Sequence, residues 1–389
     1  MKALSFLGPT HHQTILQPVA DRLAARGCDT AWYTANAEAS FEVGIARGGP
    51  SWRWLPDYCN PQARDQMYDE QIPLWRDAYK EPGPVSLLLP PVTDRIVYEI
   101  CSDWPATDAL LQDYRPDRAY ALHELNRWGM ILGYWCAVHK IPYYTTQEGM
   151  YYATPWIYTG HTRYSTTLCW GEATKRLLLS VGCPPERVRV VGHPGLQKRW
   201  EQASTTAEKK RARDSLPASW ANSKITLLYI ANVKISELNV DNLLRGLAAS
   251  PYRMVIQCGN HMGIPARAAV RDWFRDHGDI AVLSEDESLL WAQADLAECV
   301  AIMGCSTFDL ECLWRGKPLA ELWSPGQPMN FGEKGLAAVG GDRSVVDWTN
   351  AALELHATDA YTRTVKDFVA DEICNPDAAQ EIADAIIAD

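Results

Sequence analysis

The sequence predicts an α/β fold of two strand–helix halves, and three observations support this prediction. Short apolar segments alternate with helical patterns through the first 190 residues, and the alternation restarts at residue 224. Residues 198–223, between the two series, are polar and charged and contain no strand pattern. A chain of 389 residues also exceeds one ordinary core, so two domains are expected. Strands that alternate with helices predict parallel sheets covered by helices on both faces.

The first half opens with a strand and an amphipathic helix. One face of this helix is apolar and carries Ile15, Leu16, Val19 and Leu23. Gly27 ends the helix. Residues 41–84 are rich in Trp, Tyr and Pro, which favours helices and loops, and a helix over 93–114 is expected to bend near Pro105. The other predicted elements are strands at 2–8, 29–34, 117–122, 141–146, 164–170 and 187–192 and helices at 127–140 and 172–182.

The second half repeats the alternation. Its predicted strands are residues 224–232, 253–260, 279–284, 299–304 and 317–323, and its helices are residues 236–250, 265–278, 287–295 and 306–316. The expected domains are residues 1–195, a polar connector at 196–223, residues 224–372, and an amphipathic C-terminal helix within 373–389. The favoured interpretation of the connector is a solvated helical segment, and a phosphate-binding basic patch is the alternative.

Composition and charge narrow the class of protein. A hydrophobic content of 47% with 22% charged residues is typical of a folded globular chain. No apolar run approaches the length of a membrane span, and the N-terminus lacks a signal-peptide pattern, so a cytoplasmic location is expected. The 11 cysteines include no C-x-x-C pair, which favours reduced, buried thiols. A net charge of −11 disfavours a general nucleic-acid binder.

Polar residues that follow the predicted strands are the first candidates for a site. In open α/β sheets, ligands bind outside the carboxyl ends of the strands. Five of the nine histidines occupy such positions, namely His11, His12, His123, His193 and His261. Further candidates at strand ends are Glu124, Arg127, Glu148, Asn232, Gly259 and Asn260. This enrichment predicts an active cleft between the two halves.

The segment "MGCSTFDLECLWRGKP" gives the most specific signal. Ser306 or Thr307 is expected to cap a helix that directly follows a buried strand. Free N–H groups and the helix dipole make such a helix start an anion site. Glu311, about one turn further on, shares that face and could reach a ribose. A capped helix with a surface glutamate is the alternative. Dinucleotide-fingerprint and P-loop motifs are both absent from the sequence.

These segments carry a resemblance to a known superfamily. The first half ends in "CWGEATKRLLLSVGCPPERVRVVGHPG", and the second contains "GCSTFDLECLWRGKPLAEL". The chain resembles GT-B glycosyltransferases of bacterial surface-polysaccharide synthesis, which include Kdo transferases, capsule synthesis proteins and CDP-glycerol glycerophosphotransferases. It also resembles the non-hydrolysing UDP-N-acetylglucosamine 2-epimerases. The resemblance implies two Rossmann-like domains with a cleft between them and a transferase of lipopolysaccharide or capsule biosynthesis.

The resemblance also implies roles for single residues. An H-P pair contacts the donor phosphate in transferases that use CMP-linked acidic sugars, and His193 and Pro194 match that pair, with a structural turn histidine as the alternative. Gly259, Asn260, His261, Ser306, Thr307 and Glu311 complete the expected donor site. Retaining β-Kdo transferases are thought to use a carboxylate nucleophile near Asn232. In this chain residue 232 is an amide, which leaves three alternatives. The chain uses a different mechanism, its nucleophile is the nearby Glu237 or Asp241, or Asn232 replaces a carboxylate nucleophile.

The first half supplies the expected catalytic and acceptor-binding groups. Glu148 follows a strand and precedes Tyr151 and Tyr152, so partial burial could suit it to general acid or base catalysis. A structural or capping role for Glu148 is the alternative. His11 is the second catalytic candidate. Aromatic segments could pack on sugar rings, and the expected acceptor-binding residues are His12, His123, Arg127, Tyr152 and Trp156.

The expected reaction is therefore transfer of a sugar, with CMP-linked Kdo or a related acidic sugar as the leading donor. The alternatives are a UDP-N-acetylglucosamine 2-epimerase, a CDP-glycerol glycerophosphotransferase and a non-catalytic nucleotide-sugar-binding protein. The expected partners are a CMP-, CDP- or UDP-linked donor and a glycan or lipid-linked glycan acceptor, with peripheral membrane association left open and no nucleic acid. No suitably placed D-x-D motif occurs, so neither a metal ion nor a cofactor is expected.

Overall fold

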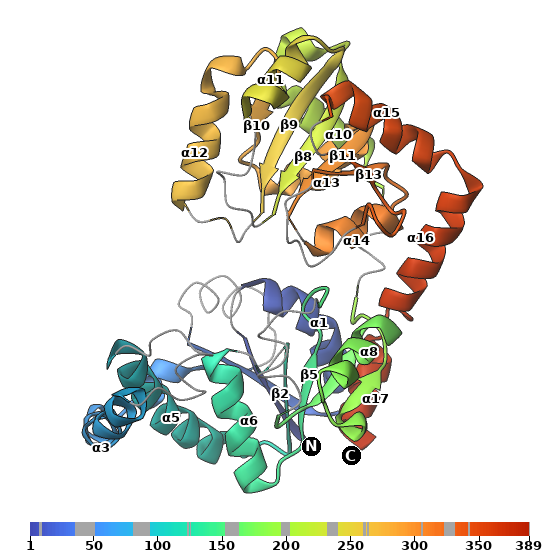
Figure 1. Ribbon diagram of the computed structural model, residues 1–389. Coiled ribbons are helices and arrows are strands. Elements are labelled where there is room, and N and C mark those ends of the chain that lie inside the picture. The colour runs from blue at the N-terminus through green and yellow to red at the C-terminus, as the bar shows by residue number, and fades with distance from the viewer. Residues whose placement is uncertain are drawn as a thin grey trace. The chain divides into compact units, whose positions relative to one another are not determined.

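A computed structural model describes most of the chain (Figure 1). The described residues are 1–7, 10–35, 51–80, 94–122, 124, 126–151, 163–195, 203–231, 240–259, 262, 264–304, 306–322, 331–340 and 343–388. The chain divides into two compact units. Unit 1 comprises Met1–Glu148, Thr154–Gly195 and Ile373–Asp389, and unit 2 comprises Gly149–Ala153 and Leu196–Glu372.

Unit 1 is built on a seven-stranded sheet in the order β3-β2-β1-β4-β5-β6-β7, with every pair parallel. Its strands are β1 (Lys2–Phe6), β2 (Asp29–Thr34), β3 (Ser51–Trp54), β4 (Arg118–Ala121), β5 (Tyr143–Thr146), β6 (Thr166–Cys169) and β7 (Val188–Val190). Its helices are α1 (Thr10–Ala25), α3 (Pro61–Lys80), α5 (Asp94–Tyr114), α6 (Arg127–His139), α8 (Glu172–Ser180) and α17 (Ala379–Ala388).

Two cores cover the two faces of this sheet. Neighbouring residues of β1 point to opposite faces, with Ala3 in one core and Leu4 in the other. The core of Ala3 takes apolar side chains from α1 and α17, and the core of Leu4 takes them from α5 and α6. The C-terminal helix α17 therefore packs beside α1 and belongs to unit 1.

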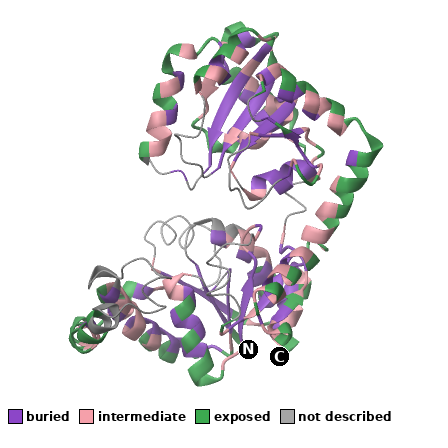
Figure 2. Cartoon of the chain, in the orientation of Figure 1, coloured by how far each residue is buried: buried purple, intermediate pink, exposed green. Residues whose placement is uncertain are grey.

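Unit 2 contains a six-stranded parallel sheet in the order β10-β9-β8-β11-β12-β13. Its strands are β8 (Lys224–Ile230), β9 (Tyr252–Cys258), β10 (Ala281–Leu283), β11 (Cys299–Met303), β12 (Leu319–Glu321) and β13 (Ala338–Val339). Its helices are α10 (Thr206–Asp214), α11 (Val240–Ala248), α12 (Ile264–Phe274), α13 (Leu290–Leu296), α14 (Thr307–Trp314), α15 (Val345–His356) and α16 (Asp359–Glu372). Figure 2 shows the strands of both sheets as mostly buried.

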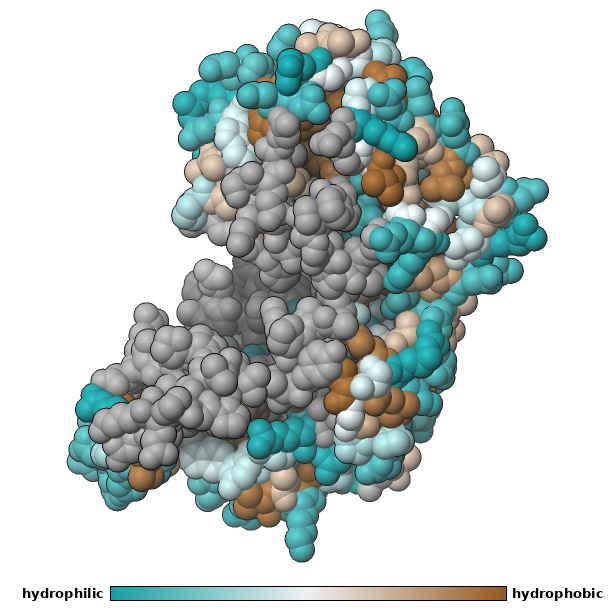
Figure 3. Space-filling model, viewed as in Figure 1, coloured by the Kyte–Doolittle hydropathy of each residue, from teal (hydrophilic) through white to brown (hydrophobic). Residues whose placement is uncertain are grey.

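The predicted α/β fold with two parallel sheets is confirmed. The structure adds α3, β3, β13, α15 and α16, which the sequence patterns did not delimit. The polar connector contains helix α10, which packs against α13. On the face drawn in Figure 3, hydrophilic residues predominate among the coloured ones. No helix among the described residues is long and apolar enough to span a membrane, and the ten cysteines described are free thiols.

Candidate functional site

In unit 2, the turn between β11 and α14 forms the most clearly built candidate site. The five residues of β11 are buried, and Gly304 turns the chain with a φ of +96°, a conformation that glycine adopts without strain. Ser306 is the N-cap of α14, as the sequence predicted, and its Oγ accepts a hydrogen bond of 3.2 Å from the N–H of Phe308. Helix α14 therefore begins at the carboxyl edge of the sheet, the edge where parallel α/β sheets bind ligands.

The start of α14 is a capping box. The carboxyl oxygen Oδ2 of Asp309 accepts a hydrogen bond of 3.2 Å from the N–H of Ser306, and Ser306 caps the first turn in return. Within unit 2, the N–H of Met150 also donates to Oγ1 of Thr307 at 3.3 Å. Glu311 lies on the same helix and is 6% exposed. The structure thus brings Ser306, Thr307 and Glu311 together on one short helix.

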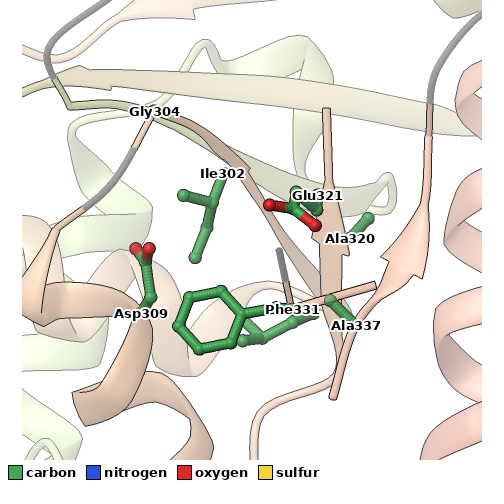
Figure 4. A pocket seen from close by; sticks show the side chains of 8 residues that line it. Ile302, Gly304, Asp309, Ala320, Glu321, Phe331 and Ala337 are labelled. Carbon is green, nitrogen blue, oxygen red and sulfur yellow. The ribbon is translucent and has the colours of Figure 1, made fainter. Parts of the chain in front are cut away.

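Two buried carboxyl groups lie beneath this helix start (Figure 4). Asp309 is 1% exposed and Glu321, on β12, is 7% exposed, and both line a small cavity with Phe331 and Ala337. Oδ2 of Asp309 binds Ser306, whereas its Oδ1 is buried without a hydrogen-bond partner. Oε2 of Glu321 accepts a hydrogen bond of 2.9 Å from the N–H of Gly332.

Burial sets the proton affinity of this pair of carboxyls. Burial raises the pKa of Asp309 well above its ordinary value, and the nearby charges of Glu321 and Glu311 add to that effect. The N–H of Ser306 opposes it. Burial also raises the pKa of Glu321, against the lowering effect of the N–H groups of Gly332 and Phe331. Burial therefore disfavours the charged form of both carboxyls under the first turn of α14.

The ends of β8 and β9 lie close together in the same unit. A Cβ atom on Gly259 would stand 2.9 Å from the carbonyl oxygen of Ala231 and 3.0 Å from the hydroxyl of Tyr229. Glycine is therefore required here by packing alone. The Tyr229 ring packs on Phe308 of α14 at 4.5 Å, and burial raises the pKa of Tyr229 to about 12. The predicted site residues Asn232, Asn260 and His261 lie outside the described residues.

A buried amide network joins β9 to α13 and to the residue after β10, and the sequence analysis did not identify it. Nε2 of Gln257 donates to Oε1 of Gln293 at 2.8 Å and to Oγ of Ser284 at 3.0 Å. It also donates to the carbonyl of Asp286 at 3.2 Å. Because Gln257 is 2% exposed, these bonds fix the loop that begins at Ser284. A glutamine that follows the apolar run Met254–Ile256 was the available signal.

In unit 1, the structure pairs two of the predicted polar residues. His12 lies in the first turn of α1, and Glu148 is the second residue after β5. Nε2 of His12 is 3.5 Å from Oε1 of Glu148, with the histidine 3% and the glutamate 28% exposed. A buried imidazole beside a partly exposed carboxylate can exchange a proton with a group in solvent. Among the candidates in this unit, this pair has the geometry of an acid–base site.

His193 is held rigidly within unit 1. Its N–H donates to the carbonyl of Asn375 at 2.7 Å, and its carbonyl accepts from the N–H of Ala378 at 2.8 Å. Nδ1 of the ring accepts a hydrogen bond of 3.1 Å from the N–H of Gly195, which places the proton of the neutral imidazole on Nε2. The ring packs on Trp170 at 4.4 Å and is 5% exposed. The backbone of His193 thus anchors the segment before α17. Its neighbour Pro194 is buried.

Glu124 and Arg127 make structural contacts in unit 1. Glu124 is 1% exposed, and its carboxyl accepts hydrogen bonds from the N–H groups of Arg163, Tyr164 and Ser165. Burial raises the pKa of Glu124, and those N–H groups oppose the effect. Arg127, predicted to bind the acceptor, forms ion pairs with Glu99 and Asp103 of α5.

The remaining predicted residues fall outside what the structure describes. His123, Tyr152 and Trp156 are not among the described residues. His11 lies within α1, and its side chain is likewise not described. His12, Glu148, His193 and Pro194 belong to unit 1, and Gly259, Ser306, Thr307 and Glu311 belong to unit 2. Asp309 was missed, although the Ser-x-x-Asp spacing of Ser306 and Asp309 is a capping-box signal.

Comparisons with known proteins identify solved structures with a similar fold. No protein-family model and no curated protein matches the chain. Among solved structures, the UDP-GlcNAc 2-epimerase of Neisseria meningitidis bound to UDP-GlcNAc is similar over 100% of both chains, with 14% identity and a TM-score of 0.60. The UDP-GlcNAc 2-epimerase of Methanocaldococcus jannaschii is similar over 100% of both chains, with 11% identity and a TM-score of 0.64. A glycosyltransferase of Rickettsia africae covers 99% of this chain and 98% of its own, with 9% identity and a TM-score of 0.60. The chain therefore has the two-domain α/β fold of these GT-B-like proteins.

Proposed function

We propose that the chain is an enzyme that binds a nucleotide-linked sugar at the start of α14 and transfers the sugar to a glycan acceptor. The observation that supports this proposal is the placement of Ser306 and Thr307 at a helix start directly after the buried strand β11. Such a helix start attracts a phosphate through its N–H groups and its dipole. Glu311, one turn further along, is the proposed partner of the ribose.

In the proposed transfer step, Glu148 and His12 of unit 1 act as the catalytic base and its supporting residue. An acceptor hydroxyl attacks the anomeric carbon of the sugar, a new carbon–oxygen bond forms, and the bond to the donor phosphate breaks. Glu148, supported by His12 at 3.5 Å, is the proposed base that takes the hydroxyl proton. The electron pair of the broken bond stays on the nucleotide phosphate, whose charge the start of α14 would stabilise. Asn232, the remaining catalytic candidate, is an amide and lies outside the described residues, so the proposed step uses no covalent intermediate there.

The identity of the donor separates the leading alternatives. The resemblance of the sequence favours CMP-linked Kdo or a related acidic sugar, whereas the similar structure from N. meningitidis was solved with UDP-GlcNAc. Calorimetric titration of CMP, CDP and UDP into the protein tests this choice. Tightest binding of CMP supports the acidic-sugar donor, tightest binding of UDP supports a UDP-sugar, and tightest binding of CDP supports glycerophosphotransfer. Binding of none of the three contradicts the proposal.

A second candidate reaction is 2-epimerisation of a UDP-linked sugar. Two similar structures that cover the whole chain are UDP-GlcNAc 2-epimerases, and this similarity favours the candidate. A turnover assay distinguishes the two reactions, because transfer releases a free nucleotide only when an acceptor is present. Epimerisation instead changes the configuration of the sugar without any acceptor. Nucleotide binding without either outcome would indicate a non-catalytic nucleotide-sugar-binding protein.

His193 is the proposed second contact to the donor phosphate. In the neutral ring the proton lies on Nε2, and a charge-assisted hydrogen bond from it would contribute roughly 1.5–3 kcal/mol. His193→Ala should then weaken nucleotide binding about 10- to 150-fold. His139→Ala is the matched control, because His139 also packs on a tryptophan, Trp135, at 4.0 Å. Equal nucleotide affinity in both variants would leave His193 with only its structural role.

A further inference from the structure

Asp309 occupies an unusual place for the acidic residue of a capping box. It lies three residues after the N-cap Ser306, a position that normally carries an exposed carboxylate. Here the side chain is 1% exposed, and its Oδ1 is buried without a hydrogen-bond partner. An ionised carboxylate in this position would leave a buried charge with one oxygen unsatisfied, which is costly.

The charges that act on Asp309 are those of acids, whereas the cations of this region act on its neighbours: Lys334 acts on Glu321, and Lys317 and Arg315 act on Cys312. The titratable groups that act on it or respond to it are Glu321 of β12, Glu311 and Cys312 of α14, and Tyr229 of β8. Glu321 lines the same cavity, and Figure 4 shows its carboxyl group turned into the space that Asp309 also borders. None of these groups carries a positive charge, so a bound proton is the remaining way to remove the buried negative charge of Asp309.

The helix start above Asp309 is also the proposed phosphate site. The N–H of Ser306 donates to Oδ2 of Asp309, so this carboxyl holds the turn in which Ser306 and Thr307 lie. An ionised carboxylate one turn from a bound phosphate would repel it, since like charges at short range in a protein interior disfavour each other. A neutral carboxyl can accept the same hydrogen bond through its carbonyl oxygen without adding that repulsion.

We propose that Asp309 is a positioning residue that holds the start of α14 as a neutral carboxylic acid, so that it adds no negative charge beside a phosphate bound at Ser306 and Thr307. Oδ2 is the carbonyl oxygen that accepts the Ser306 N–H, and Oδ1 carries the proton. The part of the proposal that concerns phosphate rests on the proposed function. Nucleotide affinity then depends on pH through Asp309, and it falls when this carboxyl ionises.

The first test examines the proton directly and needs no ligand. The infrared spectrum of the wild-type protein near neutral pH should contain a carbonyl stretch of a protonated carboxyl that is missing from Asp309→Asn. Glu208→Gln is the matched control, because Glu208 is the acidic residue of the exposed capping box of α10. Its spectrum should keep the protonated-carboxyl band unchanged. A band of equal strength in wild type and Asp309→Asn overturns the proposal.

The second test measures UDP binding by calorimetry between about pH 6 and pH 9. Wild type and Glu208→Gln should lose about tenfold in affinity as Asp309 ionises, and this loss should be missing from Asp309→Asn, in which only the phosphate and His193 still titrate. Parallel pH profiles for wild type and Asp309→Asn overturn the proposal. CMP replaces UDP if only CMP binds. Failure of both nucleotides to bind wild type refutes the proposed function, and the infrared comparison still decides the state of Asp309.

A second variant keeps the proposal testable if Asp309→Asn does not fold. Glu321→Gln removes the neighbouring carboxyl that raises the proton affinity of Asp309. The loss of nucleotide affinity should then begin at a lower pH than in wild type. An unchanged pH profile in Glu321→Gln contradicts the role assigned to the buried pair.

Discussion

Two helices of unit 2, α10 and α14, begin with the same local arrangement in different surroundings. In α10, the carboxyl of Glu208 accepts hydrogen bonds from the N–H of Thr205 at 2.6 Å and from its hydroxyl at 2.8 Å. In α14, the carboxyl of Asp309 accepts from the N–H of Ser306 at 3.2 Å. The hydrogen bonds to Thr205 lower the pKa of Glu208, whereas burial raises the pKa of Asp309.

The comparison shows that a capping box fixes the geometry of a helix start, whereas the burial of its acidic residue determines how readily that residue ionises. Glu208 is exposed to solvent, so an ionised carboxylate at the positive end of α10 is favourable. Asp309 is enclosed beside Glu321, where ionisation loses solvation and adds repulsion. The two helix starts therefore differ in how strongly their acidic residue favours the charged form.

The largest expected effect is a stability gain in Asp309→Asn. Because the folded-state pKa of Asp309 is raised, its contribution to stability is complete below the unfolded pKa and is lost as the pH rises through the folded pKa. Asparagine avoids this loss, so the free energy of unfolding should be higher in Asp309→Asn than in wild type at pH 7. Urea unfolding at several pH values checks it. The stability gain should vanish near the pKa of an unfolded aspartate, at about pH 4. A loss of stability in Asp309→Asn at pH 7 would contradict the raised pKa of Asp309.

Removal of each N-cap should have a smaller and similar effect. Ser306→Ala and Thr205→Ala each remove a side-chain oxygen that accepts a first-turn N–H. Each should lower the free energy of unfolding by about 1 kcal/mol. Urea unfolding of the two variants under one buffer condition checks the expectation. A much larger loss in Ser306→Ala would mean that packing, and not capping, dominates at α14.

The smallest expected effect is the pH dependence of Glu208→Gln. The folded-state pKa of Glu208 is lowered, so its stabilising contribution is present above the unfolded pKa and is lost as the pH falls through the folded pKa. Wild type should be slightly more stable than Glu208→Gln at neutral pH, and the two should converge in acid. Thermal unfolding across that range gives the measurement. A stability difference that grows in acid would contradict the opposite pKa shifts assigned to Glu208 and Asp309.

The sequence predicts the fold well because parallel strands buried on both faces leave clear apolar runs. The segment "CVAIMG" is such a run, and β11 covers Cys299–Met303. Short or edge strands such as β13, with two residues, carry too little pattern to be recognised. The helix start at Ser306 was predictable because its N-cap and the preceding strand are local features.

Much of the site could not be predicted because burial depends on distant parts of the chain. Asp309 is enclosed with Glu321 and Phe331, which lie 12 and 22 residues further along. The pairing of His12 with Glu148 joins the ends of β1 and β5, which are separated in the sheet by β4. Arg127 has a polar sequence context suited to a ligand, yet its ion-pair partners come from α5.

Nucleotide titration of the two N-cap variants tests most directly whether the start of α14 is the donor site. Calorimetry with UDP and CMP should show wild-type affinity in Thr205→Ala and an affinity about tenfold weaker or worse in Ser306→Ala, a change of about 1.4 kcal/mol. Because both variants lose an equivalent cap, their difference isolates the contact with phosphate. Equal affinity in wild type, Ser306→Ala and Thr205→Ala would contradict the assignment of this helix start to the nucleotide.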